Sequence, residues 1–385
     1  MNPFVFNTTP SIVFRSGAAD QIDRHVGALL GPRVLLVTDP GLRKLGLCDP
    51  AIAALRNAGH DLAIFDAVEP DPSVATVIAA VQAGIDARVT GVLGFGGGSS
   101  LDVAKVAALL LGSDQPLDEA WGVNNAQGPR LPLVLVPTTA GTGSEVTPVA
   151  ILTVGGEEKR GVSSPVILPD IALLDAGLTL DLPPSITAAT GVDAMVHAIE
   201  AYASASANNN PLSRMLAREA LRLLGANIET AVADGADLAA REAMLLGSML
   251  AGQAFANSPV AAVHALAYPV GGIFHIPHGL SNALVLPAVL RFNLPAAAAT
   301  YAEIAADAFP QLADTPEDSR AEAFVDALKT LIGRLQMPPR LRDVNIPQDA
   351  LPRMAADAMK QQRLLVNNPR PVTEADALAI YTEAW

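Results

Sequence analysis

The stretch Gly94-Phe95-Gly96-Gly97-Gly98-Ser99-Ser100-Leu101-Asp102-Val103-Ala104-Lys105 follows a short apolar run and leads into a helical pattern. Its three consecutive glycines allow positive φ and let backbone N–H groups approach an anion closely. The amino end of the following helix adds about half a positive charge, and the two serines supply hydroxyl donors. The stretch therefore predicts a phosphate-binding turn between a strand and a helix. A tight turn that binds nothing is the alternative.

Short apolar runs alternate with helical patterns on both sides of this turn. The runs that indicate strands are Val34–Thr38, Leu62–Phe65, Gly91–Phe95, Leu131–Val136 and Ile171–Leu174. The patterns that indicate helices are Gln21–Leu30, Asp49–Ala58 and Val74–Ala87. Strands separated by helices of this length are typical of βαβ units and a parallel sheet. We therefore expect an α/β domain over residues 1–182, in which Phe4–Phe14 adds a strand or a hairpin.

The pattern changes after the pair Pro183–Pro184. Strand-like runs of Val and Ile disappear, and long stretches rich in Ala, Leu and Met recur with helical period. Examples are Leu212–Leu224, Leu238–Phe255 and Ala321–Leu335. The second half of the chain, residues 183–385, is therefore predicted to be an all-helical domain.

A second loop, Thr138–Ser144, follows another apolar run in the first half. It holds four hydroxyl side chains and two glycines within seven residues. Ligands bind at the carboxyl ends of strands in open α/β sheets, so the two loops together favour a shared dinucleotide site. The alternative is an ordinary helix N-cap, because Ser and Thr are good caps.

An acidic residue, Asp39, ends the strand-like run Val34–Thr38. A carboxylate at this place accepts hydrogen bonds from the adenosine ribose of NAD and repels the additional phosphate of NADP. The alternative is that Asp39 only starts a turn, because Pro40 and Gly41 follow it.

Four of the six histidines lie between residues 197 and 278. Asp193 and His197 stand four residues apart on the helical stretch Thr190–Ala201, so their side chains share one face. His264 begins another helical stretch, and His278 follows 14 residues later. One carboxylate and three neutral imidazoles are a sufficient ligand set for a divalent ion, and imidazole suits iron and zinc alike. The alternatives are a surface ion pair and buried histidines that only bond carbonyl groups.

The composition excludes several classes of protein. Lys and Arg number 25 against 39 Asp and Glu, and the net charge of -14 repels nucleic acid and anionic membranes. The single cysteine, Cys48, excludes a disulfide framework and a zinc site built from several cysteines. No apolar stretch approaches the roughly 20 residues that a membrane helix needs, and Met1–Ser16 lacks the pattern of a signal peptide. We expect a cytoplasmic protein that binds a small molecule.

Five stretches together resemble the iron-containing (group III) alcohol dehydrogenase family over essentially the whole chain. They are GGGSSLDVAK at 96–105, PTTAGTGSEVT at 137–147, LPDIALLD at 168–175, TGVDAMVHAIEAY at 190–202 and HALAYPVGGIFHIPHG at 264–279.

The resemblance implies a Rossmann-like N-terminal domain, a helical C-terminal domain and an active site in the cleft between them. It implies that a metal, Fe²⁺ or alternatively Zn²⁺, is bound by Asp193, His197, His264 and His278. The residues that it assigns to NAD are Asp39, the loop Gly96–Ser100, Thr138, Thr139, Thr142, Thr147, Lys159 and Thr179. Family members are commonly dimers or larger assemblies, so a homo-oligomer is implied as well.

One position departs from the family pattern. Members related to lactaldehyde and ethanol oxidation often have a histidine, proposed as a proton relay, four residues after the third ligand, and here that residue is Tyr268. A phenol releases its proton less readily than an imidazolium does, so tyrosine is a poorer base at neutral pH. His275, three residues before the last ligand, is the alternative relay.

These features predict a metal-dependent oxidoreductase that transfers a hydride between NAD(H) and a small alcohol, aldehyde or ketone. A maleylacetate-reductase-like activity on an oxo acid is an alternative, but it requires carboxylate clamps, and few arginines lie near the metal motifs. A dehydroquinate-synthase-like lyase requires several basic residues, and residues 190–202 and 261–282 contain no Lys or Arg. A non-enzymatic sensor predicts a lost ligand or a blocked loop, and neither is seen.

Overall fold

The computed structural model describes residues 3–155 and 158–385, which form two compact units. The first unit contains Asn7–Thr139 and Gly143–Leu180. The second contains residues 3–6, Ala140–Thr142 and Asp181–Trp385. The middle of the second predicted loop therefore belongs to the second unit, although both of its flanks belong to the first.

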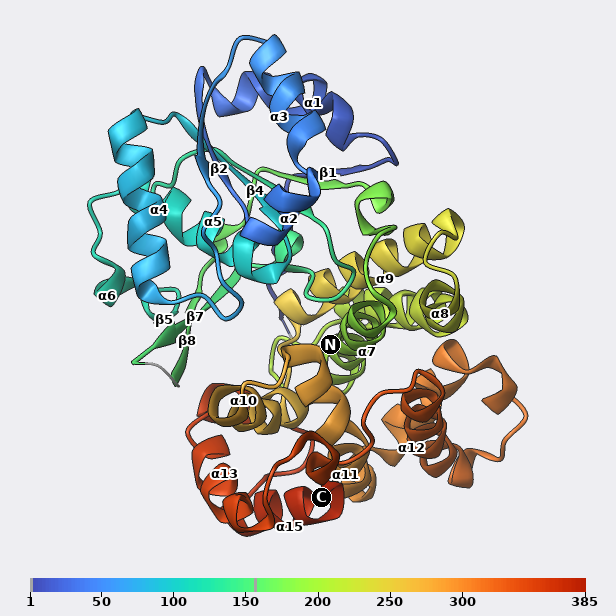
Figure 1. Cartoon of the computed structure of the whole chain (residues 1–385). Coiled ribbons are helices and arrows are strands. Elements are labelled where there is room, and N and C mark those ends of the chain that lie inside the picture. The colour runs from blue at the N-terminus through green and yellow to red at the C-terminus, as the bar shows by residue number, and fades with distance from the viewer. Residues whose placement is uncertain (1–2, 156–157) are drawn as a thin grey trace. The chain divides into compact units, whose positions relative to one another are not determined.

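A six-stranded, all-parallel sheet forms the centre of the first unit, with the strand order β1-β9-β6-β4-β2-β3 (Figure 1). Its strands are β1 (Ser11–Phe14), β2 (Arg33–Val37), β3 (Asp61–Phe65), β4 (Gly91–Gly96), β6 (Leu133–Pro137) and β9 (Ile171–Leu174). The predicted parallel α/β arrangement is confirmed. In the register of the central strands, Gly96 of β4 lies opposite Pro137 of β6. The two predicted loops therefore leave the sheet at the same edge, next to each other.

Helices cover both faces of this sheet. They are α1 (Ile22–Leu30), α2 (Pro40–Leu45), α3 (Asp49–Asn57), α4 (Val74–Ala87), α5 (Gly98–Gly112) and α6 (Leu117–Ala120). Side chains along β2 alternate between the two faces, as the pleat of a strand requires. Leu35 and Val37 join the core beneath α4 and α5. Val34 and Leu36 join the core beneath α1 and α3.

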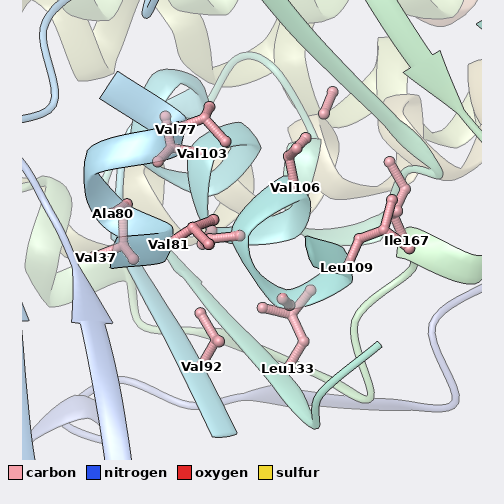
Figure 2. Packing of buried hydrophobic residues seen from close by; sticks show 14 of the residues in the cluster. Val37, Val77, Ala80, Val81, Val92, Val103, Val106, Leu109, Leu133 and Ile167 are labelled. Carbon is pink, nitrogen blue, oxygen red and sulfur yellow. The ribbon is translucent and has the colours of Figure 1, made fainter. Parts of the chain in front are cut away.

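The helix that follows the glycine turn is held firmly by this core. Figure 2 shows Val103, Val106 and Leu109 of α5 among side chains from α4 and the sheet, such as Val92 and Leu133. All five are fully buried. Each such side chain contributes roughly 1.5–3 kcal/mol to folding. Packing therefore holds the amino end of α5 in place within the first unit.

A smaller sheet in the first unit was not expected from the sequence. It contains β5 (Gly122–Val123), β7 (Val149–Val154) and β8 (Glu158–Ser163), with the order β5-β8-β7. β7 and β8 pair antiparallel, and β5 pairs parallel to β8. The second predicted loop leads into β7, so this sheet helps to hold its far end.

The first strand is shorter than predicted. Of the stretch Phe4–Phe14 only Ser11–Phe14 is a strand, which pairs parallel with β9 at the edge of the large sheet. Pro10 precedes it and has no N–H to donate. Farther upstream, the backbone N–H and C=O of Val5 each bond the Asn208 side chain at 2.9 Å within the second unit. The prediction of a strand or hairpin over the whole stretch is therefore wrong.

The second unit is helical, and no strand follows β9 in the described residues. Its helices are α7 (Pro184–Ala203), α8 (Pro211–Ala233), α9 (Leu238–Asn257), α10 (Ala262–Phe274), α11 (His278–Ala308), α12 (Glu317–Arg334), α13 (Leu351–Ala358), α14 (Gln362–Leu365) and α15 (Glu374–Ala384). The predicted all-helical second half is confirmed. The helices α7, α10 and α11 pack together and carry the predicted metal ligands.

One described helix, α11, is long and apolar enough to cross a membrane by length and composition alone. The prediction that no apolar stretch approaches the length of a membrane helix is therefore wrong. Half of the most apolar stretch of α11 is buried inside the protein. The helix packs against α7, α10 and α12. It also carries the buried polar residues Asn282 and Asn293. We interpret α11 as a core helix of the second unit.

Candidate active site

Three predicted metal ligands converge in the second unit. Asp193 lies on α7, His264 on α10, and His278 is the first residue of α11. One ligand atom of each lies within 4.8 Å of the other two. The Asp193 Oδ1 atom is 3.8 Å from Nε2 of His264 and 3.7 Å from Nε2 of His278. Segments far apart in the chain thus present one oxygen and two nitrogen ligands to a common point.

The fourth predicted ligand, His197, lies beside this group, one turn after Asp193 on α7. Its ring stacks on that of His264, with centroids 4.7 Å apart. Its Nδ1 atom is 3.2 Å from the carbonyl oxygen of Gly141, which leaves Nε2 with a free lone pair. Burial lowers the pKa of His197 to about 3, so the ring is neutral at neutral pH, and neutral imidazole is the form that binds metals.

Gly141 must be glycine for this contact to form. A Cβ at this position would lie 2.6 Å from the Cβ of Thr190 on α7, closer than two carbon atoms can approach. The missing side chain lets the loop lie against the helix, and its carbonyl group then reaches the ring of His197. The second predicted loop therefore orients a metal ligand.

A buried carboxylate that the sequence argument missed, Glu200, orients His264. Its Oε2 atom is 2.7 Å from His264 Nδ1, and its Oε1 accepts the Val263 N–H at 2.6 Å. The Nδ1–H of His264 donates to this carboxylate, so Nε2 keeps its lone pair for the cluster. Carboxylates behind histidine ligands commonly have this role in metal sites. A signal was present, because Asp193, His197 and Glu200 follow the i, i+4, i+7 spacing of one helix face.

A second missed residue, Asn282, lies among the ligand atoms. Its Nδ2 is 2.6 Å from Asp193 Oδ1, 3.4 Å from His264 Nε2 and 3.3 Å from His278 Nε2. Its own Oδ1 is buried without a hydrogen-bond partner among the described residues. An amide nitrogen has two hydrogens but here faces three acceptors. The lone pairs converge on a place that a cation would satisfy better, so the residues present fit a divalent metal.

The charge on Asp193 agrees with this interpretation. Burial would raise the pKa of its carboxyl group, but the neighbouring rings of His197, His278 and His264 and the Asn282 amide outweigh burial, and the pKa lies below its usual value. The site therefore offers a carboxylate and imidazole nitrogens, a donor set suited to iron or zinc.

The two relay candidates occupy different environments. Tyr268 lies on α10, one turn after His264, and its ring centroid is 6.2 Å from that of His278. Its hydroxyl oxygen accepts a hydrogen bond of 3.2 Å from Nη2 of Arg363. His275 ends α10 in a left-handed conformation, with φ of 56°, and its side chain is exposed. Tyr268, rather than His275, therefore lies beside a ligand ring.

The two predicted loops adjoin within the first unit. The Thr138 N–H donates to the Gly96 carbonyl at 3.0 Å, and a Cβ on Gly97 would lie 3.7 Å from the Thr139 side chain. Gly96 alone of the three consecutive glycines has positive φ, at 154°, and a Cβ there would lie 2.8 Å from Ser100 Oγ. Gly97 is the N-cap of α5 and Gly98 its first residue. The helix thus begins inside the glycine run.

Asp39 follows β2 and is the N-cap of α2, where its Oδ1 accepts the Leu42 N–H at 3.0 Å. Asp39 therefore starts a helical turn, as the alternative interpretation of its sequence position predicted. One carboxylate oxygen takes part in the cap, which leaves the other for a ligand.

Three further residues assigned to NAD take part in bonds within the first unit. The Lys159 ammonium lies 2.6 Å from Asp71 Oδ1 and donates to Thr153 Oγ1 at 2.9 Å. Thr179 is buried and its hydroxyl donates to the Ala176 carbonyl at 2.8 Å. Thr147 is also buried and accepts a hydrogen bond from a lysine. Thr142 belongs to the second unit.

That lysine, Lys105, is fully buried and was also missed by the sequence argument. It donates to Ser144 Oγ at 2.7 Å, to Thr147 Oγ1 at 3.2 Å and to the Val149 carbonyl at 2.7 Å. The Ser144 hydroxyl donates in turn to Asp102 Oδ1 at 2.7 Å. Asp102 and Lys105 lie on α5, so this network ties the helix behind the glycine turn to the second loop.

Next to this network lies a buried acid, Glu145, whose Oε1 has no hydrogen-bond partner among the described residues. Burial raises its pKa to about 7, although Lys105 acts in the opposite direction. Glu145 therefore changes charge near neutral pH.

Comparison with known proteins relates both units to one enzyme family. The profile described as iron-containing alcohol dehydrogenase matches residues 9–176, and the profile of the family's C-terminal domain matches residues 187–385. A long-chain-alcohol dehydrogenase of Geobacillus thermodenitrificans is 40% identical over 96% of this chain and 93% of its own. A sulfoacetaldehyde reductase of Bilophila wadsworthia is 37% identical over 98% of both chains.

Solved structures agree with these sequence relatives. A 1,3-propanediol oxidoreductase superposes with a TM-score of 0.95 at 35% identity and covers 100% of both chains. A sulfoacetaldehyde reductase from Bifidobacterium kashiwanohense, solved in complex with NAD⁺, superposes with a TM-score of 0.88 at 29% identity, over 99% of this chain and 98% of its own.

Proposed function

We propose residue roles from one premise: the chain belongs to the iron-containing alcohol dehydrogenase family. It is an NAD-linked oxidoreductase that acts between alcohols and aldehydes. The convergence of Asp193, His264 and His278 on one point is the observation that carries the assignment of roles.

The metal ligands in this proposal are Asp193, His197, His264 and His278, with Fe²⁺ as the ion and Zn²⁺ as the alternative. When bound, the ion polarises the oxygen of the alcohol or aldehyde, and the nicotinamide accepts or donates the hydride.

The residues around these ligands hold them in the binding arrangement. Glu200 and the Gly141 carbonyl each accept a hydrogen bond from Nδ1–H of a ligand histidine, and both histidines then keep Nε2 unprotonated. Asn282 donates to Asp193 and fixes the direction of that carboxylate. Ligands that are already oriented lose less side-chain entropy when the ion binds.

We assign the phosphates of NAD to the glycine turn Gly96–Ser100 and to the adjoining loop that contains Thr138 and Thr139. Backbone N–H groups at the amino end of α5 are suited to this task. Asp39 is assigned to the ribose through its second carboxylate oxygen. Thr142 and Thr147 are also assigned to NAD.

Lys159 and Thr179 are also assigned to NAD, but the cofactor would have to compete with their present bonds. Lys159 would exchange its contact with Asp71, and Thr179 its bond to a backbone carbonyl. Their contributions are therefore expected to be smaller than those of the two loops.

We assign the proton relay to Tyr268 in preference to His275. The Tyr268 oxygen accepts a hydrogen from Arg363, so its own hydroxyl hydrogen is directed elsewhere and can be donated. Its ring also lies near that of His278, whereas His275 is exposed at the end of α10.

We further propose that residues 1–182 bind the dinucleotide and residues 183–385 bind the metal and the substrate. A cytoplasmic homo-oligomer is part of the proposal, because members of the family are commonly dimers or larger assemblies. The acidic net charge of -14 supports only the further proposal that nucleic acid and anionic membranes are not partners.

Metal reconstitution tests these assignments. The protein is stripped with a chelator, supplied with Fe²⁺ or Zn²⁺, and assayed by NADH absorbance with a panel of aldehydes. We expect negligible turnover without metal and recovery with at least one of the two ions. Full turnover of rigorously stripped protein would contradict the metal assignment.

A further inference from the structure

Beyond the ligands, the second unit places an arginine against the relay tyrosine. The guanidinium of Arg363 donates from Nη2 to the Tyr268 hydroxyl at 3.2 Å, and its Cζ lies 6.0 Å from the centre of the tyrosine ring. Tyr268 shares a helix face with His264, four residues before it, and its ring centroid lies 6.2 Å from that of His278. A positively charged group therefore lies one side chain away from the ligand cluster.

The helix that carries Arg363 is fixed in place. α14 packs against α10 and buries Leu364 and Leu365. The buried Asn367 side chain donates both to the Arg363 carbonyl at 3.0 Å and to the Val260 carbonyl at 3.1 Å, just before α10. The backbone of Arg363 is thus anchored, while its side chain is exposed.

Arg363 differs from several arginines of the same unit, although Arg342 likewise lies over an aromatic ring with no ion pair to a carboxylate in the part of the chain that is described. Arg214, Arg218 and Arg291 each form an ion pair with a carboxylate. In residues 3–155 and 158–385, by contrast, no carboxylate forms an ion pair with Arg363. What distinguishes Arg363 is its position, because its guanidinium lies next to the tyrosine beside the ligand cluster and has no carboxylate to neutralise it in a protein whose net charge is -14.

The Arg363 guanidinium offers only hydrogen-bond donors to a ligand. Arg363 uses one of its five N–H groups on the phenol oxygen, so the remaining N–H groups can face an anion. Arginine binds carboxylate and similar oxyanions with paired hydrogen bonds. Simple packing of the arginine stem over an aromatic ring is the structural alternative, and it predicts no preference among substrates.

We propose that Arg363, held in place by the Tyr268 hydroxyl, forms a subsite for an organic oxyanion, a carboxylate or sulfonate at the far end of a short aldehyde or alcohol. This inference rests on the proposed function, because it places the reacting end of the substrate at the metal ligands. It also supplies the basic residue whose absence from the ligand segments argued against acidic substrates.

Paired substrates test the subsite. Succinic semialdehyde and its neutral amide have nearly the same shape and differ in charge, and sulfoacetaldehyde provides a second anion. The readout is the ratio of kcat/KM for the acid to kcat/KM for the amide, measured in the metal-loaded enzyme at low and high salt. We expect the wild-type ratio to exceed one, and Arg363→Gln to lower it by about tenfold, as for a hydrogen bond to a charged group.

Matched variants distinguish binding of the anion by Arg363 from the general effect of losing one positive charge. Arg340→Gln removes an exposed arginine of the same unit and should leave the ratio unchanged, whereas Arg363→Lys should retain part of it. Added salt should shrink the wild-type ratio. The subsite is refuted if the wild type shows no preference for either anion, or if Arg363→Gln lowers acid and amide equally. Failure of the wild type to reduce any aldehyde would instead refute the function on which the subsite rests.

Discussion

The metal cluster and the dinucleotide loops are built in opposite ways. The cluster in the second unit consists of side chains from three helices. Three of the four ligands are oriented by another group: His264 by Glu200, Asp193 by Asn282 and His197 by the Gly141 carbonyl. The loops in the first unit offer mainly backbone N–H groups at the amino end of α5, where Gly96 is the one glycine of the three with positive φ.

This difference predicts how each site responds to change. A site made of a few side chains loses its ligand when one is removed, because no other group replaces it. A site made of backbone amides distributes its contacts, and a single side-chain change has a smaller effect. The most damaging substitutions should therefore cluster in the second unit.

Removal of a ligand should have the largest effect. We expect His264→Ala to abolish turnover and to weaken metal binding by well over the roughly 100-fold expected for a supporting residue, because His264 contributes a nitrogen directly to the ligand cluster. NADH binding, measured by fluorescence titration, should remain nearly intact. His25→Ala, which removes a histidine from the first unit, is the control. Full turnover by His264→Ala would show that His264 is no ligand.

Glu145, the buried acid of the first unit, should affect the pH dependence of the free energy of unfolding and not metal binding. Burial raises the pKa of Glu145 from 4.5 to about 7, so the folded state binds its proton more tightly than the unfolded state does. The free energy of unfolding should therefore fall as pH rises between these two values and stay level above them. The total is on the order of 3 kcal/mol.

Urea unfolding of the wild type and Glu145→Gln at several pH values measures this contribution. The variant should lack this component of the pH dependence. Parallel curves for the two proteins would mean that Glu145 ionises normally.

Loss of an orienting group should have an intermediate effect on the metal site. We expect Glu200→Ala to weaken metal binding by about 10–100-fold in a chelator competition assay. Glu200→Gln should be less severe, because one oxygen still accepts from His264 while the amide nitrogen faces the Val263 N–H. Unchanged affinity in both variants would reduce Glu200 to a packing role.

The smallest effect is expected at Asp39. Asp39→Asn keeps an N-cap for α2 and removes the charge, so the preference for NAD over NADP should narrow by about twofold to fivefold, the size expected for one exposed charge. Asp39→Gly should narrow it as well, with some loss of stability at the cap. An unchanged ratio of the two kcat/KM values in both variants would remove the ribose assignment.

Local structure could be predicted from the sequence, whereas contacts between residues far apart in the chain could not. The glycine turn and the strands around it followed from apolar runs and helical spacing, and the spacing of Asp193 and His197 placed both on one face of α7. The length of the first strand was misjudged, because residues 3–6 belong to the helical unit, where Val5 bonds Asn208.

The residues that were missed depend on distant neighbours. Lys105 resembles an ordinary helix lysine until β6 and β7 bring Ser144 and Val149 to it. Arg363 lies 85 positions after His278 in the chain, and only the packing of α14 on α10 brings it to Tyr268. No local pattern encodes such pairs.

The central claim is that one divalent ion is bound by side chains of α7, α10 and α11. Anomalous diffraction from crystals of iron-loaded protein, recorded on both sides of the iron absorption edge, tests it most directly. We predict a single strong peak in each chain, bonded to Asp193, His197, His264 and His278. An iron peak bound elsewhere, or none in protein that turns over substrate, would contradict this account.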